Sequence, residues 1–363
     1  MNYTWKVDQF WCIYFWIRFF YLLFAVIVYE RVAGLGDANG YLNSELFFSY
    51  KVFISSTAFM KCVGGLFGTL FGGMNVISNF PFMLYSFFIV RWTIEKLKFR
   101  RGVSSGLLLL LISFPNFCIW TSGCLKEIVG LTFSAVYAVL IVNFLQGDYK
   151  IRMRDILATY LCLLFKPQYF PFIFQGLLFI YIANKWCHTW RTRLFWGVFI
   201  IFCNVVFLYC IKDIINQYAG MMYVHFDTAT ATSTRENIFI KDNDFFREAP
   251  WGMFIAFWGP TLQEMWTKPL QLIAGLESLF IILFFIFLLG RFIARLLCLW
   301  KINITIFFSY FIIITGICFL HYPFGIFNPG SAIRYRTNFI YLFIILLLHL
   351  YVFYKNNPIT YRK

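Results

Sequence analysis

Charged side chains are scarce in this chain of 363 residues, because only 13% of its positions are Asp, Glu, Lys or Arg. Soluble domains carry about 25% of these residues, so the shortage excludes an ordinary soluble protein. Histidine is also rare, with 4 in all, and no group of Cys and His has the spacing of a zinc site. Aromatic residues, in contrast, reach 23%, which excludes a disordered chain because such chains lack apolar surface to bury.

Apolar residues make up 61% of the chain and form long blocks separated by short charged runs. Because a helix needs about 20 mainly apolar residues to cross a bilayer, the sequence predicts an all-α integral membrane protein with about ten transmembrane helices, several of them short or broken. A single polytopic domain is expected over residues 1–363. The net charge of +15 is spread over short runs rather than one face, which favours contact with the lipid bilayer and no nucleic-acid partner.

Three polar stretches, residues 30–65, 212–270 and 321–337, are expected to lie together on one side of the membrane. Lys and Arg are concentrated in the short segments expected on the other side, and such segments stay in the cytoplasm. Both termini are therefore predicted to be cytoplasmic and the three polar stretches to be extracytoplasmic loops. The expected spans cover residues 10–29, 66–92, 106–121, 128–145, 156–165, 170–183, 194–211, 271–290, 302–320 and 338–354.

Two apolar blocks are interrupted. Pro115 and Asn116 break one of them, and Lys166 with Pro167 follows an apolar segment of only ten residues, which is too short to cross as a helix. Irregular backbone at membrane depth is tolerated only where it is buried in protein or lines a wet cavity. The turn at Lys166 is therefore the clearest indication of a site in the sequence.

One carboxylate, Asp37, follows the first expected helix in a run from Gly34 to Tyr41, whose glycines let the backbone bend closely around a ligand. A simple turn explains the same residues, and a catalytic carboxylate is the alternative. Secondary candidates on the same side are Glu127, Glu264 and His321.

Four cations depart from the positive-inside trend because they are expected at the outer face: Lys126, Lys166, Arg334 and Arg336. Arg binds phosphate through two parallel hydrogen bonds and Lys binds it as a point charge, so a phosphate site accounts for the whole set. Snorkelling of long side chains toward the head groups is the alternative for any one of them.

Two charges fall inside expected spans, Arg18 in the first and Glu277 in the eighth. A charge at the centre of a membrane helix costs about 2.5 to 3.5 kcal/mol on insertion scales, so both side chains are expected to face the interior of the bundle. A function and a structural ion pair are both open for them.

Four stretches resemble, in spacing and character, the multi-spanning proteins of bacterial surface-polysaccharide pathways. They are Gly36-Asp37 followed by Tyr41, the block from Phe114-Pro115 to Lys126-Glu127, the stretch from Phe257-Trp258-Gly259-Pro260 to Glu264, and Arg334-Tyr335-Arg336. Within that group the chain is similar to the integral-membrane glycosyltransferases of the GT-C fold. The resemblance implies that Asp37 serves the acceptor and that the sugar donor is carried on a polyprenyl phosphate.

The resemblance implies a glycosyltransferase of O-antigen or capsule biosynthesis in the cell inner (plasma) membrane. Its substrate would be a polyprenyl-phosphate-linked glycan, and other membrane proteins of polysaccharide assembly are candidate partners. No cofactor and no metal ligand are expected, although a divalent metal is left open. Two alternatives stay open: an O-antigen-type polymerase, which is similar in length, Phe-rich composition and one large outside loop bearing Arg, and a flippase or transporter for lipid-linked sugars.

Overall fold

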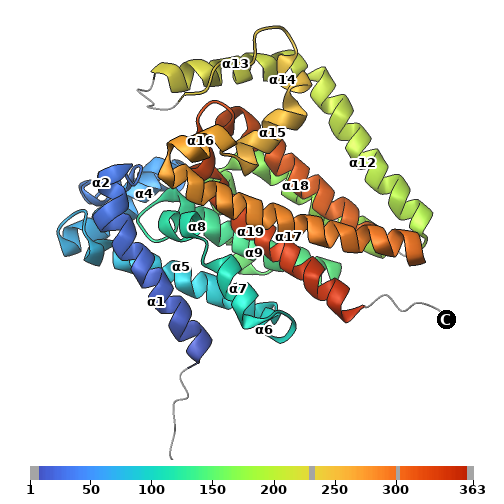
Figure 1. Ribbon diagram of the computed structural model, residues 1–363, viewed down its shortest axis with the longest axis horizontal. Helices are drawn as coiled ribbons and strands as arrows, with labels where there is room; N and C mark the ends of the chain where they lie inside the picture. The colour runs from blue at the N-terminus through green and yellow to red at the C-terminus, as the bar shows by residue number, and fades with distance from the viewer. Residues whose placement is uncertain (1–7, 229–233, 300–302, 358–363) are drawn as a thin grey trace, which may run out of the picture. The chain divides into compact units, whose positions relative to one another are not determined.

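The computed structural model of the protein describes residues 8–228, 234–299 and 303–357, and every regular element among them is helical (Figure 1). The predicted all-α class is therefore confirmed for these residues. The chain forms two compact units. Unit 1 comprises residues 8–139, 156–165 and 337–355, and unit 2 comprises the other described residues.

Among the described residues, six helices are long and apolar enough to cross a membrane, and the chain is accordingly a membrane-embedded protein. They are Gln9–Val32, Lys126–Leu145, Trp190–Cys210, Pro269–Arg295, Ile304–Gly325 and Pro329–Asn356. Met153–Phe165 and Pro167–Lys185 pass the same test only as a pair with a break, which gives up to 7 spans. The expected span 106–121 is divided between two short helices. The expected span 66–92 is divided between the end of one helix and Val76–Lys96, which has 21 residues but is not among the six. Length and apolar composition together therefore support fewer spans than the sequence predicts.

Unit 1 begins with a continuous helical stretch made of α1 (Gln9–Leu23), the π-helical η1 (Phe24–Tyr29) and α2 (Glu30–Val32). It continues with α3 (Ala38–Leu42), η2 (Tyr50–Phe53), α4 (Ser56–Phe71), α5 (Val76–Lys96), α6 (Phe99–Gly102), α7 (Ser105–Ile112) and α8 (Pro115–Trp120). Three helices belong in part to each unit: α9 (Lys126–Leu145), α10 (Met153–Phe165) and α19 (Pro329–Asn356).

Helix α5 shows how local sequence sets these boundaries. The Asn75 side chain accepts a hydrogen bond from the Ser78 amide at 2.9 Å, and the Ser78 hydroxyl accepts one from the Asn75 amide at 3.1 Å. This capping box satisfies two amides that the first turn leaves without helical partners. It starts α5 within the expected span 66–92, which is why that span is divided between α4 and α5.

A glycine face on α4 receives the backbone of α3. Gly64, Gly65 and Gly68 are buried there, and a Cβ at Gly68 would collide with the carbonyl group of Leu42. Only glycine permits such close approach of a helix to another backbone segment. This contact fixes the position of α3, which begins directly after Asp37.

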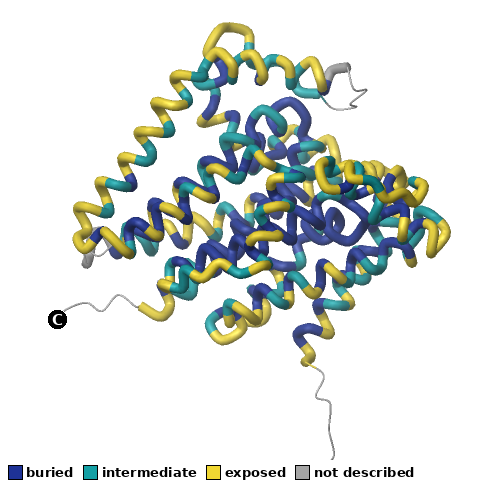
Figure 2. The backbone as a smooth tube through the Cα atoms, turned by 180° about the vertical axis from the view of Figure 1, so that it is seen from behind, coloured by how far each residue is buried: buried dark blue, intermediate teal, exposed yellow. Residues whose placement is uncertain are grey.

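Unit 2 is built around α18 (Ile304–Gly325), which contacts α11, α12 and α15. Its other elements are η3 (Pro167–Tyr169), α11 (Phe170–Lys185), α12 (Trp190–Cys210), α13 (Lys212–Thr228), α14 (Asp244–Arg247), α15 (Ala249–Trp258), α16 (Leu262–Thr267) and α17 (Pro269–Leu299). Figure 2 shows the contrast between the largely buried α18 and α12, in which only Gly197 is buried. The apolar surface of α12 suits contact with lipid.

The stretches expected as loops are largely helical. The described residues within 212–270 include α13 to α16, and residues 30–65 contain α2, α3, η2 and the start of α4. Within 321–337 only residues 326–328 lie outside a helix, so His321, Arg334 and Arg336 are helical residues rather than residues of an irregular loop. The reason is a strong start signal: Asn328 accepts a hydrogen bond from the Ser331 amide at 2.9 Å, and Pro329 occupies the first turn of α19.

Candidate functional site

Asp37 lies at the amino end of α3 in unit 1. Its side chain is exposed, and its Oδ2 accepts a hydrogen bond from the Tyr41 hydroxyl at 3.3 Å. Gly34 at φ 71° and Gly36 at φ 58° produce the turn before it, and these left-handed conformations favour glycine. A carboxylate in this position can accept a proton from a bound hydroxyl group.

The turn before Asp37 packs against the expected block that ends at Glu127. Leu35 is fully buried, and a Cβ at Gly123 would lie 3.1 Å from Leu35 Cδ2. The two segments, which are far apart in the sequence, therefore meet within unit 1.

The same block carries two of the predicted site residues at the start of α9. Lys126 Nζ donates a hydrogen bond to Thr57 Oγ1 at 2.9 Å, and the Glu127 side chain is buried. The preceding turn is fixed because Asn79 Oδ1 accepts a hydrogen bond from the Cys124 amide at 2.9 Å. Unit 1 thus contains Asp37, Lys126 and Glu127 on segments that pack together.

Arg18 is fully buried in unit 1, as expected for a charge inside a span. Its Nη1 donates to Thr121 Oγ1 at 2.9 Å, and its Nη2 donates to the Thr121 carbonyl at 2.7 Å and to the Ser86 hydroxyl. The Phe117 ring centroid lies 5.8 Å from its Cζ. Neutral dipoles and an aromatic face hold this charge, and they connect α1 to α5 and α8.

In unit 2, Lys166 and Arg334 both lie near the ring of Tyr335. Lys166 Nζ lies 4.3 Å from the ring centroid and Arg334 Cζ lies 5.8 Å from it. Lys166 follows the last residue of α10 and precedes the single turn of η3, so the predicted break in the chain is confirmed there. All three side chains are half-buried, which lets the cations meet a ligand at the protein surface.

Arg336 is buried one residue beyond Tyr335 in α19, and its donors reach groups of unit 2. Its Nη1 donates to Ser278 Oγ at 2.5 Å and to the carbonyl groups of Phe257 and Gly259 at 3.2 Å each, and its Nη2 donates to the Ala274 carbonyl at 3.2 Å. Its Nη2 also lies 3.6 Å from a carboxylate oxygen of Glu277, so the ion-pair alternative for Glu277 is observed. Arg336 therefore ties the start of α19 to α15 and α17.

His321 is fully buried in α18, with its ring centroid 5.2 Å from that of Phe257. The charges of Lys166 and Arg336 both act on the His321 ring. Five predicted site residues belong to unit 2: Lys166, Glu264, His321, Arg334 and Arg336. Their meeting with Asp37 and Lys126 of unit 1 stays a prediction.

Glu264, the remaining secondary candidate, forms a two-point ion pair with Arg235. Arg235 Nε lies 2.7 Å from Oε1 and Nη2 lies 2.7 Å from Oε2, while the Thr261 amide donates to Oε2 at 2.8 Å. Arg235 Nη1 also donates to the carbonyl groups of Gly325 at 2.9 Å and Ile326 at 3.0 Å. The pair therefore joins residues 235–264 to the carboxyl end of α18.

The Arg235 contact also sets the acidity of Glu264. Burial raises the pKa of the Glu264 carboxyl, but the hydrogen bonds and charge of Arg235, together with the Thr261 amide, outweigh burial and leave the pKa below its ordinary value of 4.5. A carboxylate with a lowered pKa and two occupied oxygens is a weak proton acceptor. Glu264 is accordingly a structural group in the folded chain.

Arg235 is the residue that the sequence did not indicate. Its partner Glu264 is 29 residues away and the Gly325 carbonyl is 90 residues away, so no local pattern links them. The other half of the arrangement does have a signal, because Thr261 and Glu264 have the spacing of a helix capping box, which α16 confirms.

No group of three or more His, Cys, Asp or Glu side chains within the described ranges is arranged to hold a metal ion. The chain matches no protein-family model, no curated protein and no solved structure.

Proposed function

We propose that this membrane protein is a glycosyltransferase that takes a sugar from a polyprenyl-phosphate carrier at the extracytoplasmic face, in the biosynthesis of a surface polysaccharide. The observation that supports the proposal is the placement of Lys166 and Arg334 near one ring, that of Tyr335. Lys supplies a compact charge and Arg a planar fork, and both groups bind phosphate. Because these side chains are half-buried, their attraction for an anion is stronger than it would be in bulk water.

The proposed reaction has one covalent step. Asp37 accepts the proton of an acceptor hydroxyl, whose oxygen bonds to the anomeric carbon of the donor sugar. The bond from that carbon to the phosphate oxygen breaks, and the polyprenyl phosphate leaves with the electron pair. Proton removal by a positioned carboxylate contributes about 10² to 10⁴-fold to the rate.

Stabilisation of the departing phosphate contributes more to the rate of such reactions than proton removal does. Lys166 and Arg334 are assigned this task, with Lys126 as a further cation from unit 1. Arg336, the fourth cation of the set, donates to Ser278 and the Ala274 carbonyl and pairs with Glu277, so it would have to leave these partners to touch a ligand. Glu127 and His321 are assigned secondary roles. Glu127 is buried and follows Lys126 in the sequence, and His321 is buried where the charges of Lys166 and Arg336 act on it.

The proposal includes a topology. Ten spans, cytoplasmic termini and a plasma-membrane location would place Asp37, Lys166 and Arg334 on the extracytoplasmic side. Single cysteines in a cysteine-free background, labelled with a membrane-impermeant maleimide in intact spheroplasts, test it. Labelling at Lys241→Cys with protection at Arg101→Cys is expected, and the reverse pattern would contradict the orientation.

A polymerase that joins lipid-linked repeat units is the alternative function. It is favoured by helices α13 to α16 within residues 212–270, since α14 among them carries the exposed Arg247. The polymerase would use the same phosphate site, since its leaving group is also a polyprenyl phosphate carrier.

Purified protein in liposomes, supplied with radiolabelled lipid-linked sugar and an unlabelled glycan acceptor, separates these functions. Transfer of a single labelled sugar supports the proposal, and a ladder of repeats supports the polymerase. Movement of intact lipid-linked sugar across the bilayer without a new glycosidic bond would identify a transporter. The absence of both a new bond and movement, with protein that remains folded, would overturn all three.

A further inference from the structure

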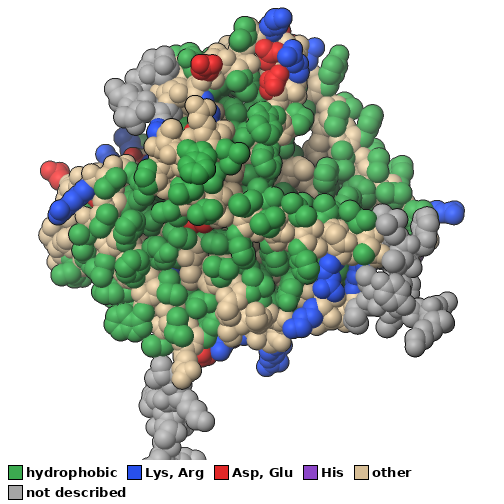
Figure 3. Space-filling view, in the orientation of Figure 1, with side chains coloured by type: hydrophobic (Ala, Val, Ile, Leu, Met, Phe, Trp, Pro, Cys, Tyr) green, Lys and Arg blue, Asp and Glu red, His purple; other side chains and the backbone are tan. Residues whose placement is uncertain are grey.

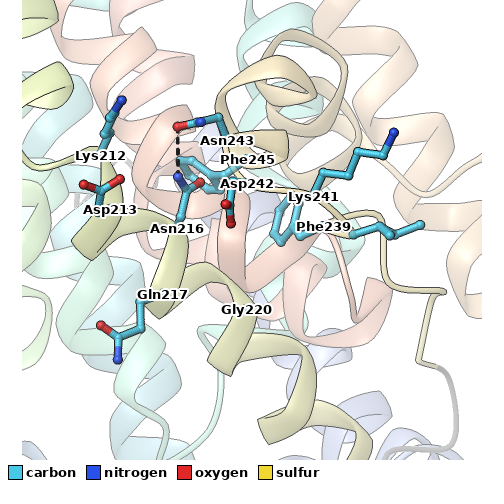
Figure 4. A pocket seen from close by; sticks show the side chains of 11 residues that line it. Lys212, Asp213, Asn216, Gln217, Gly220, Phe239, Lys241, Asp242, Asn243 and Phe245 are labelled. Atoms are coloured by element: carbon cyan, nitrogen blue, oxygen red, sulfur yellow. Dashed lines mark hydrogen bonds between the residues drawn. The ribbon is translucent and has the colours of Figure 1, made fainter.

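A polar cleft of about 570 Å³ lies in unit 2 between α13 and the segment 239–245. Figure 3 shows charged side chains of both signs gathered over α13 and α14, beside hydrophobic side chains along α12. Figure 4 shows Asn216 of α13 and Asn243 of the segment pointing toward one another, and Asn216 Nδ2 donates to Asn243 Oδ1 at 3.2 Å. The volume lies within the range of about 300 to 1,000 Å³ that is usual for small-molecule sites.

The loop wall of this cleft is held in place before any ligand arrives. The Asp244 carboxylate accepts hydrogen bonds from the Lys241 amide at 2.7 Å and from the Ile240 amide at 3.0 Å. Behind it, the Phe245 ring stacks on Tyr322 of α18 with ring centroids 4.7 Å apart. Because this wall is already ordered, binding costs less conformational entropy.

The free groups in the cleft are a mixture of donors and acceptors. Asp213, Gln217 and Asp242 are exposed and are not engaged by other residues in the part of the chain that the structure describes. Carboxylates only accept hydrogen bonds, whereas the Gln217 amide both donates and accepts. A phosphate requires donors alone and a metal ion requires acceptors alone, while a sugar hydroxyl, which donates and accepts, matches the mixture.

The charges of the cleft also favour an uncharged ligand. Its lining contains two Asp and two Lys, and Lys212 Nζ lies 5.0 Å from the centroid of the Tyr209 ring outside the lining. Figure 4 shows the ammonium groups of Lys212 and Lys241 pointing away from the Asn216 and Asn243 pair. The half-buried Phe239 adds an apolar aromatic face, against which the C–H side of a sugar ring can pack.

We propose that the cleft between α13 and residues 239–245 is a binding site for an uncharged oligosaccharide. Its identification as the glycan that accepts the transferred sugar rests on the proposed function. The cleft is then a subsite for the acceptor chain, separate from the cations that hold the donor phosphate.

Binding without turnover tests the proposal. The probe is the uncharged oligosaccharide fraction released by mild acid from the lipid-linked glycans of the producing cells, added to the full chain in nanodiscs. Saturation-transfer NMR is expected to show binding to the unmodified protein. Gln217→Ala and Asp242→Ala are each expected to weaken it at least tenfold, because each removes about 1.4 kcal/mol or more of hydrogen bonding.

Gln263→Ala is the matched control, since Gln263 is also an exposed glutamine but lies on α16 outside the cleft lining. It is expected to leave binding unchanged, and equal melting temperatures of all variants show that folding is intact. No binding by the unmodified protein, or equal binding by Gln217→Ala and Asp242→Ala, would overturn the proposal, as would displacement of the oligosaccharide by inorganic phosphate.

Binding and transfer assays together show whether the cleft proposal or the proposed glycosyltransferase function has failed. Oligosaccharide binding that depends on Gln217 and Asp242, in a protein that transfers no sugar, supports the cleft and removes the glycosyltransferase. Sugar transfer that is insensitive to both substitutions supports the glycosyltransferase and removes the cleft as its acceptor site.

Discussion

Two acids at the start of short helices have opposite fates in this molecule. Asp37 precedes α3 in unit 1 and its carboxylate is exposed. Glu264 in α16 of unit 2 accepts a hydrogen bond from Arg235 at each of its two carboxylate oxygens. Both acids come shortly after a Gly or Pro in a polar stretch, so the sequence treats them alike. Glu264 holds the fold together through Arg235, whereas the Asp37 carboxylate is exposed and accepts a hydrogen bond from the Tyr41 hydroxyl.

The cations divide in the same way. Lys166 and Arg334 are half-buried near the Tyr335 ring, whereas the buried Arg336 donates to carbonyl groups and Ser278 and pairs with Glu277. Position along the chain does not reveal this difference, because a single residue separates Arg334 from Arg336. Substitutions that separate activity from stability can therefore test the comparison.

The largest effect is expected for Asp37→Asn. The amide cannot accept the acceptor proton as a carboxylate does, so the rate of sugar transfer should fall by about 10² to 10⁴-fold. The amount of protein in the membrane should not change, because Asp37 is exposed. Quantitative transfer assays and immunoblots measure both, with Glu264→Gln as the matched acid control, which should keep most of the activity of the folded fraction. Full activity of Asp37→Asn would remove Asp37 from the mechanism.

Arg235→Ala should have the opposite profile. The substitution leaves Glu264 without this partner and removes the donor to the carbonyl groups of Gly325 and Ile326. The free energy of unfolding should therefore fall by about 2 to 4 kcal/mol. Thermal unfolding in detergent measures the change. Arg247→Ala is the control, because the Arg247 side chain is 73% exposed and should contribute less than about 0.5 kcal/mol. Equal melting temperatures of the two variants would contradict a structural role for the pair.

Smaller effects on donor binding are expected from Lys166→Ala and Arg334→Ala. Each should raise KM for the lipid-linked donor about tenfold, which corresponds to about 1.4 kcal/mol, with the melting temperature unchanged. Lys185→Ala is a matched control, since Lys185 Nζ also lies over a tyrosine, 5.4 Å from the Tyr149 ring centroid. A similar KM for all three variants and the unmodified protein would place the phosphate elsewhere.

The smallest effect is expected in the dependence of the melting temperature on acidic pH. Because the folded-state pKa of Glu264 is lowered from 4.5, its ionised form stabilises the folded state at pH values above the unfolded-state pKa, and this contribution is lost as pH falls through the folded-state pKa. The melting temperature of the unmodified protein should therefore fall more steeply below pH 4.5 than that of Glu264→Gln. Parallel pH profiles would show that Arg235 does not act on the charge of Glu264.

Much of the helical framework follows from the sequence. The apolar runs of α12, α17 and α18 are long enough to predict them, and the breaks at Pro115 and Lys166 occur where the sequence interrupts its apolar blocks. The charged residues of the stretch 321–337 suggest a loop, whereas residues 329–336 are helical. Asn328 and Pro329 carried the correct signal, a capping side chain followed by proline in the first turn.

The site was predictable only as a set of residue types. The sequence indicates cations near broken helices, and Lys166 does lie at the break between α10 and η3, but its role in a phosphate site stays a prediction. It cannot indicate which charges are already satisfied, because the partners of Arg235 and Arg336 come from distant segments. Burial and pairing are long-range properties, and in a membrane protein they decide which charged groups can meet a substrate.

The grip of Arg235 on the end of α18 has a consequence for biosynthesis. Gly325 and Ile326 are synthesised about 60 residues after Glu264, and at about 5 to 20 residues per second the ribosome needs about 3 to 12 s to reach them. During that interval Arg235 has Glu264 within reach but lacks the carbonyl groups of Gly325 and Ile326. The segment from Arg235 to Glu264 is therefore joined to α18 only after α17 and α18 have left the ribosome, so in a nascent chain halted before α18 proteases should cut this segment readily.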